Sequence, residues 1–390
     1  MLRIHICDND SRLAELADDW NALAGRDPLR RHEWLATWWR YFGQGKRLLA
    51  LEVRDAAGQL VGLAPWYLTR SFLAGWTVRR MGDEVACSDH PEILAAPEWR
   101  DAVIDTIADF LLAQRRNLAG TSPANGRTDC DSTGAPSQNP RWPGWSDLVF
   151  DCVLDEEPTI TRLCDRLSIA GCAIDRLPQP NVWRLPLPAD WDTYLAQLSK
   201  SHRKQLRRFQ SRLFDTGRAR LYTVTRADQL PTAWTIFVDL HQRRRRSLGE
   251  PGLFTDKRFA AWLRAVAERL LPRDMLRLSW LTLDGQSVAA EFQIAGEGVR
   301  YAYQAGIEPE ALEQEPGRLI TLATLRAAQE EGAAVFDFLR GDEPYKPHWR
   351  AEPHAAHTLR ITAPRVWPRL RRRAWRWGNA AKAKILNPKS

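Results

Sequence analysis

The stretch FDFLRGDEPYKPHW, residues 336–349, begins as an apolar strand, carries an aspartate inside it and then breaks into charged, aromatic and proline residues. The apolar neighbours Phe336, Phe338 and Leu339 are typical of a buried strand. An unpaired carboxylate is costly in such a strand, so Asp337 must have a partner or a chemical task. Two interpretations stay open: Asp337 belongs to a reaction site, or it only caps or salt-bridges a neighbouring loop.

The chain around this stretch is long enough for more than one core. Its 390 residues fit two domains of roughly 150 to 200 residues. Hydrophobic residues make up 44% and charged residues 27%, which is a globular composition. No apolar run approaches the roughly 18 residues of a membrane span, and the N-terminal MLRIHICDND lacks the apolar core of a signal peptide. We therefore expect a cytoplasmic protein.

Cysteine spacing argues against a zinc site, and the net charge favours an anionic partner. The six cysteines include no CxxC pair and none has a zinc-like spacing from histidine, so we expect reduced thiols and no bound metal. The net charge of +8, with a pI near 9.4, favours an anionic partner. Nucleic acid, lipid headgroups and a phosphate-bearing cofactor all satisfy that condition. The position of the charge must decide between them.

The two halves of the chain share a layout. Residues 48–65 and 278–292 each contain an apolar strand, a turn with Asp followed by Gly-Gln, and a second apolar strand. One such pair is weak support for a duplication, because Asp-Gly hairpins are common. We predict a domain at 1–178 with a mobile loop at about 120–144, a second domain at 179–362, and a basic amphipathic tail at 363–390.

The second half predicts a mixed α/β sheet, in the order meander, crossover helix and strand. In such sheets, ligands bind at strand ends near helix N-termini. The crossover helix opens with Glu315, Pro316, Gly317 and Arg318, so its first N–H groups are expected to be free at the positive end of the helix dipole. This start predicts a pyrophosphate site, and a well-started helix with no ligand is the alternative.

A polar line runs along the meander. Glu291 and Gln293 point to the same face of their strand, and Tyr301 and Tyr303 alternate similarly on the next one. A carboxylate beside tyrosines and Asp337 is suited to general-base removal of a proton from an amine or hydroxyl. The ordinary solvated face of a sheet is an equally open interpretation.

Two further basic regions lie in the second half. Six lysines and arginines surround the predicted helix 200–212, and four arginines follow one another at 243–246. Such runs are usually solvated faces, but this density also suits an acidic ligand.

The tail has a different pattern. Trp367, Leu370, Ala374 and Trp377 recur at helical spacing among arginines. This pattern is typical of a helix lying on an anionic membrane, or of one docked on the protein's own surface.

Several segments together resemble a known family. They are SKSHRKQLRRFQSRL, VAAEFQI, YAYQAGI, PGRLITLATLRAAQEEG and FDFLRGDEPYKPHW, and they resemble the CelD-like acetyltransferases of the GNAT superfamily, relatives of the FemABX aminoacyl transferases. The N-terminal WNALA, HEWLATWWRYF and GLAPWYL fit the same family, so the resemblance covers nearly the whole chain. It implies two tandem GNAT folds of FemABX-like architecture, with the donor bound by the C-terminal one.

The resemblance also implies an activity, the transfer of an acetyl or other acyl group from acyl-CoA to an amine or hydroxyl. Gly317, Arg318 and Leu319 would contact the CoA pyrophosphate, although EQEPGRL matches the usual GNAT phosphate loop only in Gly317. Arg203, Arg207 and Arg340 are the expected substrate-binding residues. The expected reaction centre contains Asp337, Glu291, Tyr303, Tyr345 and Lys346.

The expected mechanism is direct transfer. Asp337 or Glu291 accepts the proton of the acceptor, backbone N–H groups polarise the thioester carbonyl, and Tyr303 or Tyr345 protonates the leaving thiolate. Relatives act in exopolysaccharide, cellulose or cell-envelope biosynthesis. A sugar or envelope precursor near the inner face of the membrane is therefore the expected acceptor, and DNA is not an expected partner. Two alternatives remain: an aminoacyl-tRNA donor, and a non-catalytic adaptor in polysaccharide assembly.

Overall fold

The computed structural model describes residues 1–71, 74–86, 88–89, 92–113 and 144–386, with side chains as far as Trp377 in the last helix. The chain divides into two compact units. The predicted loop at 120–144 lies almost entirely outside the described residues, and the predicted domain boundaries stay a prediction. Unit 1 comprises Met1–Ala24, Gly43–Gln179 and His357–Ser390, and unit 2 comprises Gly25–Phe42 and Pro180–Ala356.

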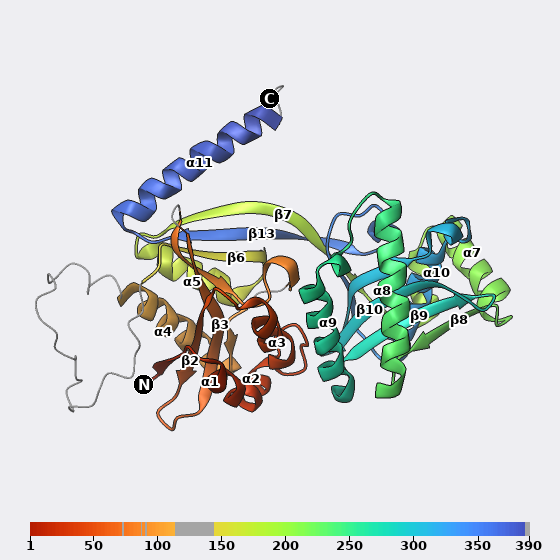
Figure 1. The fold of residues 1–390 in the computed structure, drawn as a ribbon, viewed down its shortest axis with the longest axis horizontal. Coiled ribbons are helices and arrows are strands. Elements are labelled where there is room, and N and C mark those ends of the chain that lie inside the picture. The colour runs from red at the N-terminus through yellow and green to blue at the C-terminus, as the bar shows by residue number, and fades with distance from the viewer. Residues whose placement is uncertain (72–73, 87, 90–91, 114–143, 387–390) are drawn as a thin grey trace, which may run out of the picture. The chain divides into compact units, whose positions relative to one another are not determined.

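Unit 1 is a mixed sheet with helices (Figure 1). Its helices are α1 (Asp10–Glu15), α2 (Ala17–Ala24), α4 (Arg100–Ala113), α5 (Pro158–Ile169) and α11 (Val366–Leu386). Strands β7 and β13 run on into unit 2. The strand order is β1 (Arg3–Cys7), β2 (Arg47–Arg54), β3 (Leu60–Ser71), β4 (Gly75–Arg80), β6 (Asp147–Leu154), β13 (Glu352–Thr362) and β7 (Ala173–Pro186), with β5 (Leu94–Ala95) paired to β3.

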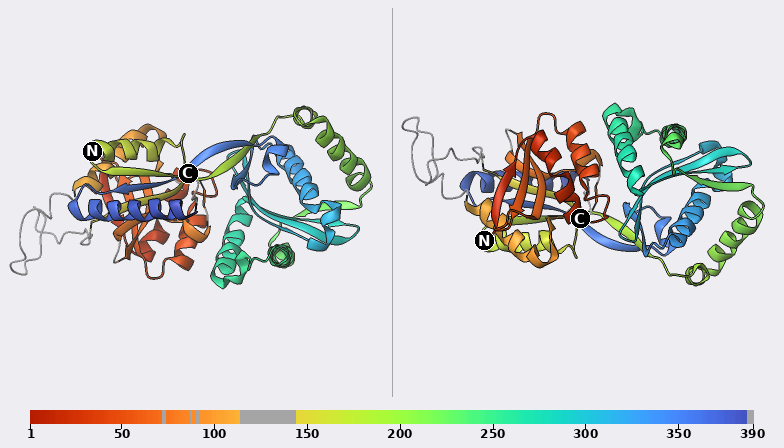
Figure 2. Two further views of the ribbon diagram at one scale, coloured as in Figure 1. Left: turned by 90° about the horizontal axis from the view of Figure 1, so that it is seen from above. Right: turned by 90° about the horizontal axis from the view of Figure 1, so that it is seen from below.

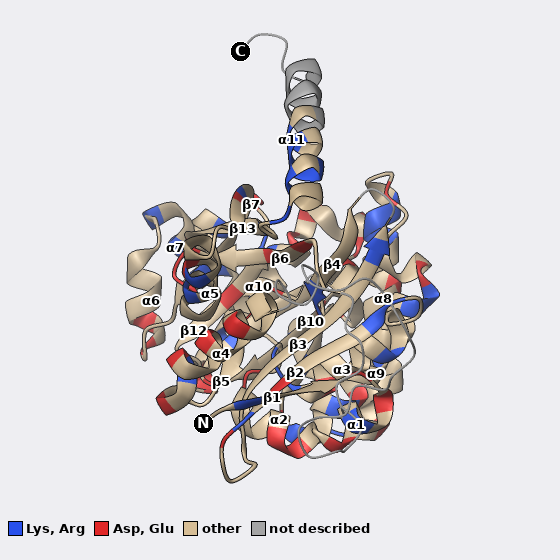
Figure 3. Cartoon of the chain, turned by 90° about the vertical axis from the view of Figure 1, so that its left-hand side faces the viewer, with Lys and Arg blue, Asp and Glu red and all other residues tan. Residues whose placement is uncertain are grey.

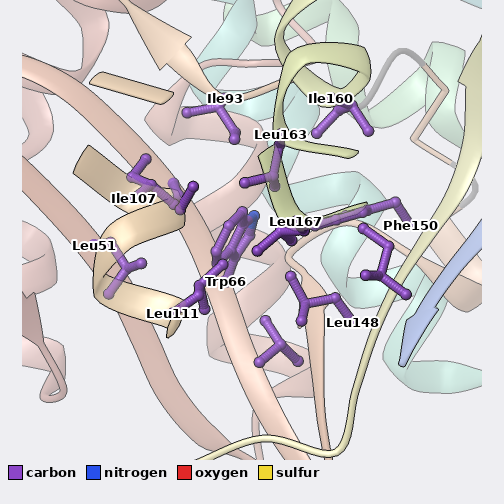
Figure 4. Close-up of a cluster of buried hydrophobic side chains, with 14 of the residues drawn as sticks. Leu51, Trp66, Ile93, Ile107, Leu111, Leu148, Phe150, Ile160, Leu163 and Leu167 are labelled. Atoms are coloured by element: carbon purple, nitrogen blue, oxygen red, sulfur yellow. The ribbon is translucent and has the colours of Figure 1, made fainter. Parts of the chain in front are cut away.

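The core of unit 1 forms where α4 and α5 pack on this sheet. Trp66 of β3 lies at its centre, with its ring centroid 5.5 Å from that of Phe150 on β6 (Figure 4). Ile107 and Leu111 of α4 and Leu163 of α5 pack in the same buried cluster. Burying each of these side chains contributes about 1.5 to 3 kcal/mol, so the apolar faces of the two helices are what hold them against the strands.

Unit 2 has the same kind of fold. Figure 2 shows α8 and α9 on one face of its sheet and α10 on the other. Its helices are α3 (His32–Phe42), α6 (Trp191–Gln197), α7 (Lys200–Phe209), α8 (Leu230–Ser247), α9 (Lys257–Leu270) and α10 (Pro316–Glu330). Its strand order is β7, β12 (Val335–Arg340), β11 (Val299–Ile307), β10 (Gln286–Gly296), β9 (Leu276–Leu283) and β8 (Ala219–Thr223).

The predicted meander, crossover helix and strand are confirmed in unit 2. Strands β9, β10 and β11 are successive antiparallel neighbours, and the β9–β10 turn is formed by Asp284 and Gly285, both at positive φ. Helix α10 then crosses over to β12, which runs parallel to β11. Close approach of the backbones fixes α8 on this sheet: a Cβ on Gly306 of β11 would lie 2.3 Å from the backbone nitrogen of His241.

The two units repeat this arrangement, as the shared layout of the two halves predicted. In unit 1, β2, β3 and β4 are successive antiparallel neighbours, α4 follows, and β6 pairs with β4 in parallel over three residues. In unit 2, β12 pairs with β11 in parallel over three residues. Each unit therefore contains one pair of parallel strands whose ladder is short.

Candidate active site

A cavity of about 790 Å³ opens in unit 2 where β11 and β12 diverge, beside the start of α10. The parallel ladder ends at the pair Tyr301 and Asp337, and the cavity lies beyond it. Such clefts at the ends of strands, close to a helix N-terminus, are common ligand sites. The predicted residues that line it are Glu291, Tyr303, Gly317, Arg318, Arg340, Tyr345 and Lys346.

The backbone of β12 explains why a strand contains Asp337. Leu339 has a left-handed φ of 57°, which is unusual for a leucine. Its N–H donates to Oδ1 of Asp337 at 2.7 Å, while Nε of Arg184 on β7 lies 3.1 Å from Oδ2. The buried carboxylate therefore has a charged partner and also stabilises the bend at Leu339. The parallel ladder with β11 ends at Asp337, two residues before that bend.

Glu291 is placed as a proton acceptor. It is 8% exposed, and it accepts hydrogen bonds from Nε2 of Gln293 and, at 3.2 Å, from Oγ1 of Thr324 on α10. Arg300 donates in turn to Oε1 of Gln293 at 3.1 Å, which holds the amide in place. Burial raises the pKa of Glu291 to about 7, against the opposing effect of the two hydrogen bonds. The solvated-face interpretation is wrong, because both Glu291 and Gln293 are buried.

Two tyrosines line the cavity with Glu291. The ring of Tyr303 packs edge-on against Trp34, with centroids 5.1 Å apart. A register shift in the β10–β11 ladder leaves Tyr303 as the extra residue on β11, which turns this strand locally. Tyr345 is 46% exposed, and desolvation followed by the charges of Glu291 and Glu343 raises its pKa well above the ordinary value. Tyr345 therefore stays protonated at neutral pH.

More of the backbone N–H groups at the start of α10 are hydrogen-bonded than the sequence predicts. The N–H groups of Arg318 and Leu319 both donate to the carbonyl of Glu315, at 3.0 and 3.1 Å, so the prediction that they are free is wrong. Pro316 has no N–H, and no group among the described residues accepts a hydrogen bond from the N–H of Gly317. The carboxylate of Glu315 pairs with Arg318 and accepts a hydrogen bond from Gln205. Any anion at this helix start must compete with Glu315 for Arg318.

Arg244 is a lining residue that was not among the predicted site residues. Within its arginine run, Arg243 pairs with Glu308 at 2.6 Å and Arg245 with Glu250 at 2.9 Å. Arg244 has no ion pair with any described residue, and it lines the cavity. The run of four arginines pointed to this region, but the sequence does not show that Arg244 and Arg245 line the cavity while Arg243 and Arg246 do not.

Four predicted residues are not among those that line the cavity: Asp337, Leu319, Arg203 and Arg207. Leu319 is buried in the apolar cluster beneath α10. Arg203 donates to the carbonyl of Ala196 at 3.3 Å, and Arg207 lies 3.7 Å from Asp192.

Lys346 does line the cavity, but its Nζ donates to backbone carbonyls. The acceptors are those of Leu339, at 3.1 Å, and Gly341, at 2.8 Å. Lys346 therefore supports the end of β12.

The equivalent place in unit 1 holds an ion-pair network. Where β4 and β6 diverge, Arg79 lies 2.5 Å from Asp83 and 3.0 Å from Asp151, and the hydroxyl of Tyr67 donates to Asp83 at 2.7 Å. The charges of these groups are paired with one another, whereas Arg244 in unit 2 has no ion pair with any described residue.

Comparisons with known proteins bear on the fold and on the domain at residues 200–347. Residues 200–347 match the model of a family described as "Acetyltransferase (GNAT) domain". A search of curated proteins found no match. Among the residues that the structure describes, no helix is long and apolar enough to cross a membrane.

Solved structures show the fold. FemX is similar at a TM-score of 0.60 and 11% identity, covering 93% of this chain and 98% of its own. A conserved protein of unknown function from Bacteroides thetaiotaomicron is similar at 0.54 and 10% identity, covering 92% of this chain and 100% of its own. These likenesses show the mixed α/β fold, and the family match covers residues 200–347. Residues 200–347 of this chain thus match a GNAT acetyltransferase domain, and the fold as a whole resembles that of FemX.

Proposed function

We propose that this protein transfers an acyl group from acyl-CoA to an amine or hydroxyl of a sugar or cell-envelope precursor, at the unit 2 cavity. The observation that carries the proposal is Glu291, a buried carboxylate with a pKa of about 7 in a cavity formed by two diverging strands. A general base works best with a pKa near the working pH. Of the two carboxylates predicted for this role, only Glu291 lines the cavity, whereas Asp337 is engaged with Arg184 and Leu339.

The cavity suits an extended thioester donor. Beyond the short ladder, the edges of β11 and β12 face each other across the cavity, and an amide-bearing chain can hydrogen-bond to such edges as an added strand does. Arg244 and Arg318 lie at the same cavity and offer positive charge to phosphate groups. The N–H of Gly317 adds a donor at the positive end of α10.

The reaction then proceeds in one displacement. Glu291 removes the proton from the acceptor nitrogen or oxygen as that atom forms a bond to the thioester carbonyl carbon. The carbon–sulfur bond breaks, and the thiolate takes a proton from Tyr345 or Tyr303, both of which line the cavity. Backbone N–H groups of the diverging strands would stabilise the oxyanion.

A ligand-induced shift in thermal unfolding tests the donor. A ligand that binds only the folded state raises its stability by mass action, so acetyl-CoA, longer acyl-CoAs and free CoA are compared at rising concentration. Arg318→Ala and Arg244→Ala should reduce the shift. Arg326→Ala and Arg246→Ala are matched controls: Arg326 also lies on α10 and pairs with Glu330 at 2.9 Å, and Arg246 belongs to the same arginine run.

The outcomes separate the donor classes. A shift that both cavity variants reduce, and that both controls retain, supports acyl-CoA binding at α10. No shift at millimolar acyl-CoA would refute this donor. The aminoacyl-tRNA alternative would then require tRNA binding that weakens steeply with salt. The adaptor alternative requires that Glu291→Gln retain function in cells.

A further inference from the structure

Helix α11 of unit 1 is attached to its unit by one face. Nε and Nη2 of Arg372 lie 2.6 and 2.8 Å from the carboxylate oxygens of Asp175 on β7. The guanidinium of Arg360 on β13 lies 4.6 Å from the ring centroid of Trp375. These contacts orient the first turns of the helix, and so they also fix the direction of its opposite face.

The opposite face carries large apolar side chains. At 100° per residue, Trp367, Leu370, Ala374 and Trp377 fall in one arc, away from Arg372. Trp367 is 73% exposed, Leu370 47% and Trp377 81%. A soluble surface seldom gathers such residues in one stripe, so this face is suited to an apolar contact.

A groove of about 930 Å³ runs along this face. Trp367, Leu370 and Ala374 line its helix side, and Trp76 of β4 lines the sheet side. The described residues that line it include arginines but no aspartate or glutamate, and the blue segments of α11 in Figure 3 show how basic the described part of the helix is. The arginines of the groove are Arg70, Arg365 and Arg371.

The groove arginines have no counter-ion among the described residues. Neither Arg365 nor Arg371 forms an ion pair there, and the guanidinium of Arg70 lies over the ring of Trp76, 5.5 Å from its centroid. Partial burial lowers the pKa of Arg365, which is the effect of desolvating a charge without a compensating anion. An anion in the groove would supply that compensation.

We propose that this groove and the exposed face of α11 bind the surface of an anionic phospholipid bilayer. The headgroup phosphate would lie among Arg365, Arg371 and Arg70, while Trp367 and Leu370 enter the interfacial region. Tryptophan prefers this region, and each arginine near an anionic surface contributes about 1 kcal/mol. A free phosphate would satisfy the arginines but leave the apolar stripe in water, which is why a lipid surface fits better. The inference does not depend on the acyltransferase proposal.

Vesicle flotation of the full chain tests this site. Vesicles of phosphatidylcholine alone are compared with vesicles that also contain phosphatidylglycerol. We expect binding only to the second kind, and a loss of about 30-fold in partitioning for Arg365→Gln/Arg371→Gln, because two arginines are removed. Trp367→Ser/Leu370→Ser should lose about tenfold or more through lost apolar burial. A soluble glycerol phosphate should not displace the protein.

Matched variants guard against a general charge effect. Arg208→Gln/Arg212→Gln removes the same charge from exposed positions in unit 2 and should float as the wild type does. Thermal unfolding confirms that each variant is folded. The inference is overturned if the wild type does not float with phosphatidylglycerol, if the control pair loses as much binding as the groove pair, or if glycerol phosphate or an RNA oligonucleotide displaces the protein from the vesicles.

Discussion

Replacing Glu291 by glutamine should abolish a pH dependence of stability as well as remove a base. The ordinary pKa of 4.5 rises to about 7 in the folded protein. A difference of about 2.5 units at about 1.4 kcal/mol per unit amounts to ~3 kcal/mol, and the side chain is buried, so solvent screening is small. The folded state binds the proton more tightly than the unfolded state does. Stability of unit 2 therefore falls as pH rises from about 4.5 to about 7, and it levels off above that.

The variant lacks this titration. Its amide oxygen can still accept from Gln293 or Thr324, so we expect Glu291→Gln to match the wild type near pH 5 and to be more stable by up to ~3 kcal/mol at pH 8. Urea unfolding at both pH values, with hydrogen exchange of segment 286–296, reports on unit 2. Glu313→Gln, an exposed charge in the same unit, is the control.

Activity gives a second, independent reading of the same change. The assay uses an acyl-CoA that binds and a panel of amino sugars as acceptors. Wild-type kcat/KM should rise as the pH passes through about 7, because Glu291 loses its proton there. Glu291→Gln should lose about 10²- to 10⁴-fold at pH 8 and show no such rise. If the wild type and the variant had the same pH dependence of stability, the inference that burial raises the pKa of Glu291 would be refuted. If stability behaved as expected but activity persisted, Glu291 would be buried without serving as the base.

Two other substitutions probe the framework of the site. Asp337→Asn should lower the stability of unit 2 by about 1 to 3 kcal/mol, because Arg184 loses its charged partner. The folded variant should retain its kcat/KM. A large loss of kcat/KM at unchanged stability would instead identify Asp337 as the base. Gly306→Ala should lower the free energy of unfolding, measured with urea, by about 1 to 3 kcal/mol, because the added Cβ would meet the backbone of His241 and α8 must shift. Unchanged stability would show that α8 moves freely on β11.

Much of the architecture was predictable from local patterns. The Asp284-Gly285 turn and the alternation on either side of it indicated the β9–β10 hairpin, and Pro316 indicated the start of α10. Turn chemistry, strand alternation and helix starts depend on residues close in sequence. The amphipathic spacing of Trp367 and Leu370 likewise predicted a helix, and α11 is one.

The chemistry of individual side chains depended on residues far apart in sequence. The sequence left open whether Glu291 was solvated; its burial and raised pKa follow from α10, which brings Thr324 over it. Asp337 could be a base or a structural group until Arg184 of β7 and the bend at Leu339 were in place. Arg244 differs from Arg243 and Arg245, which pair with acidic residues such as Glu308, and from Arg246, which does not line the cavity. A pKa or an ion pair depends on distance and desolvation, and only the tertiary structure sets both.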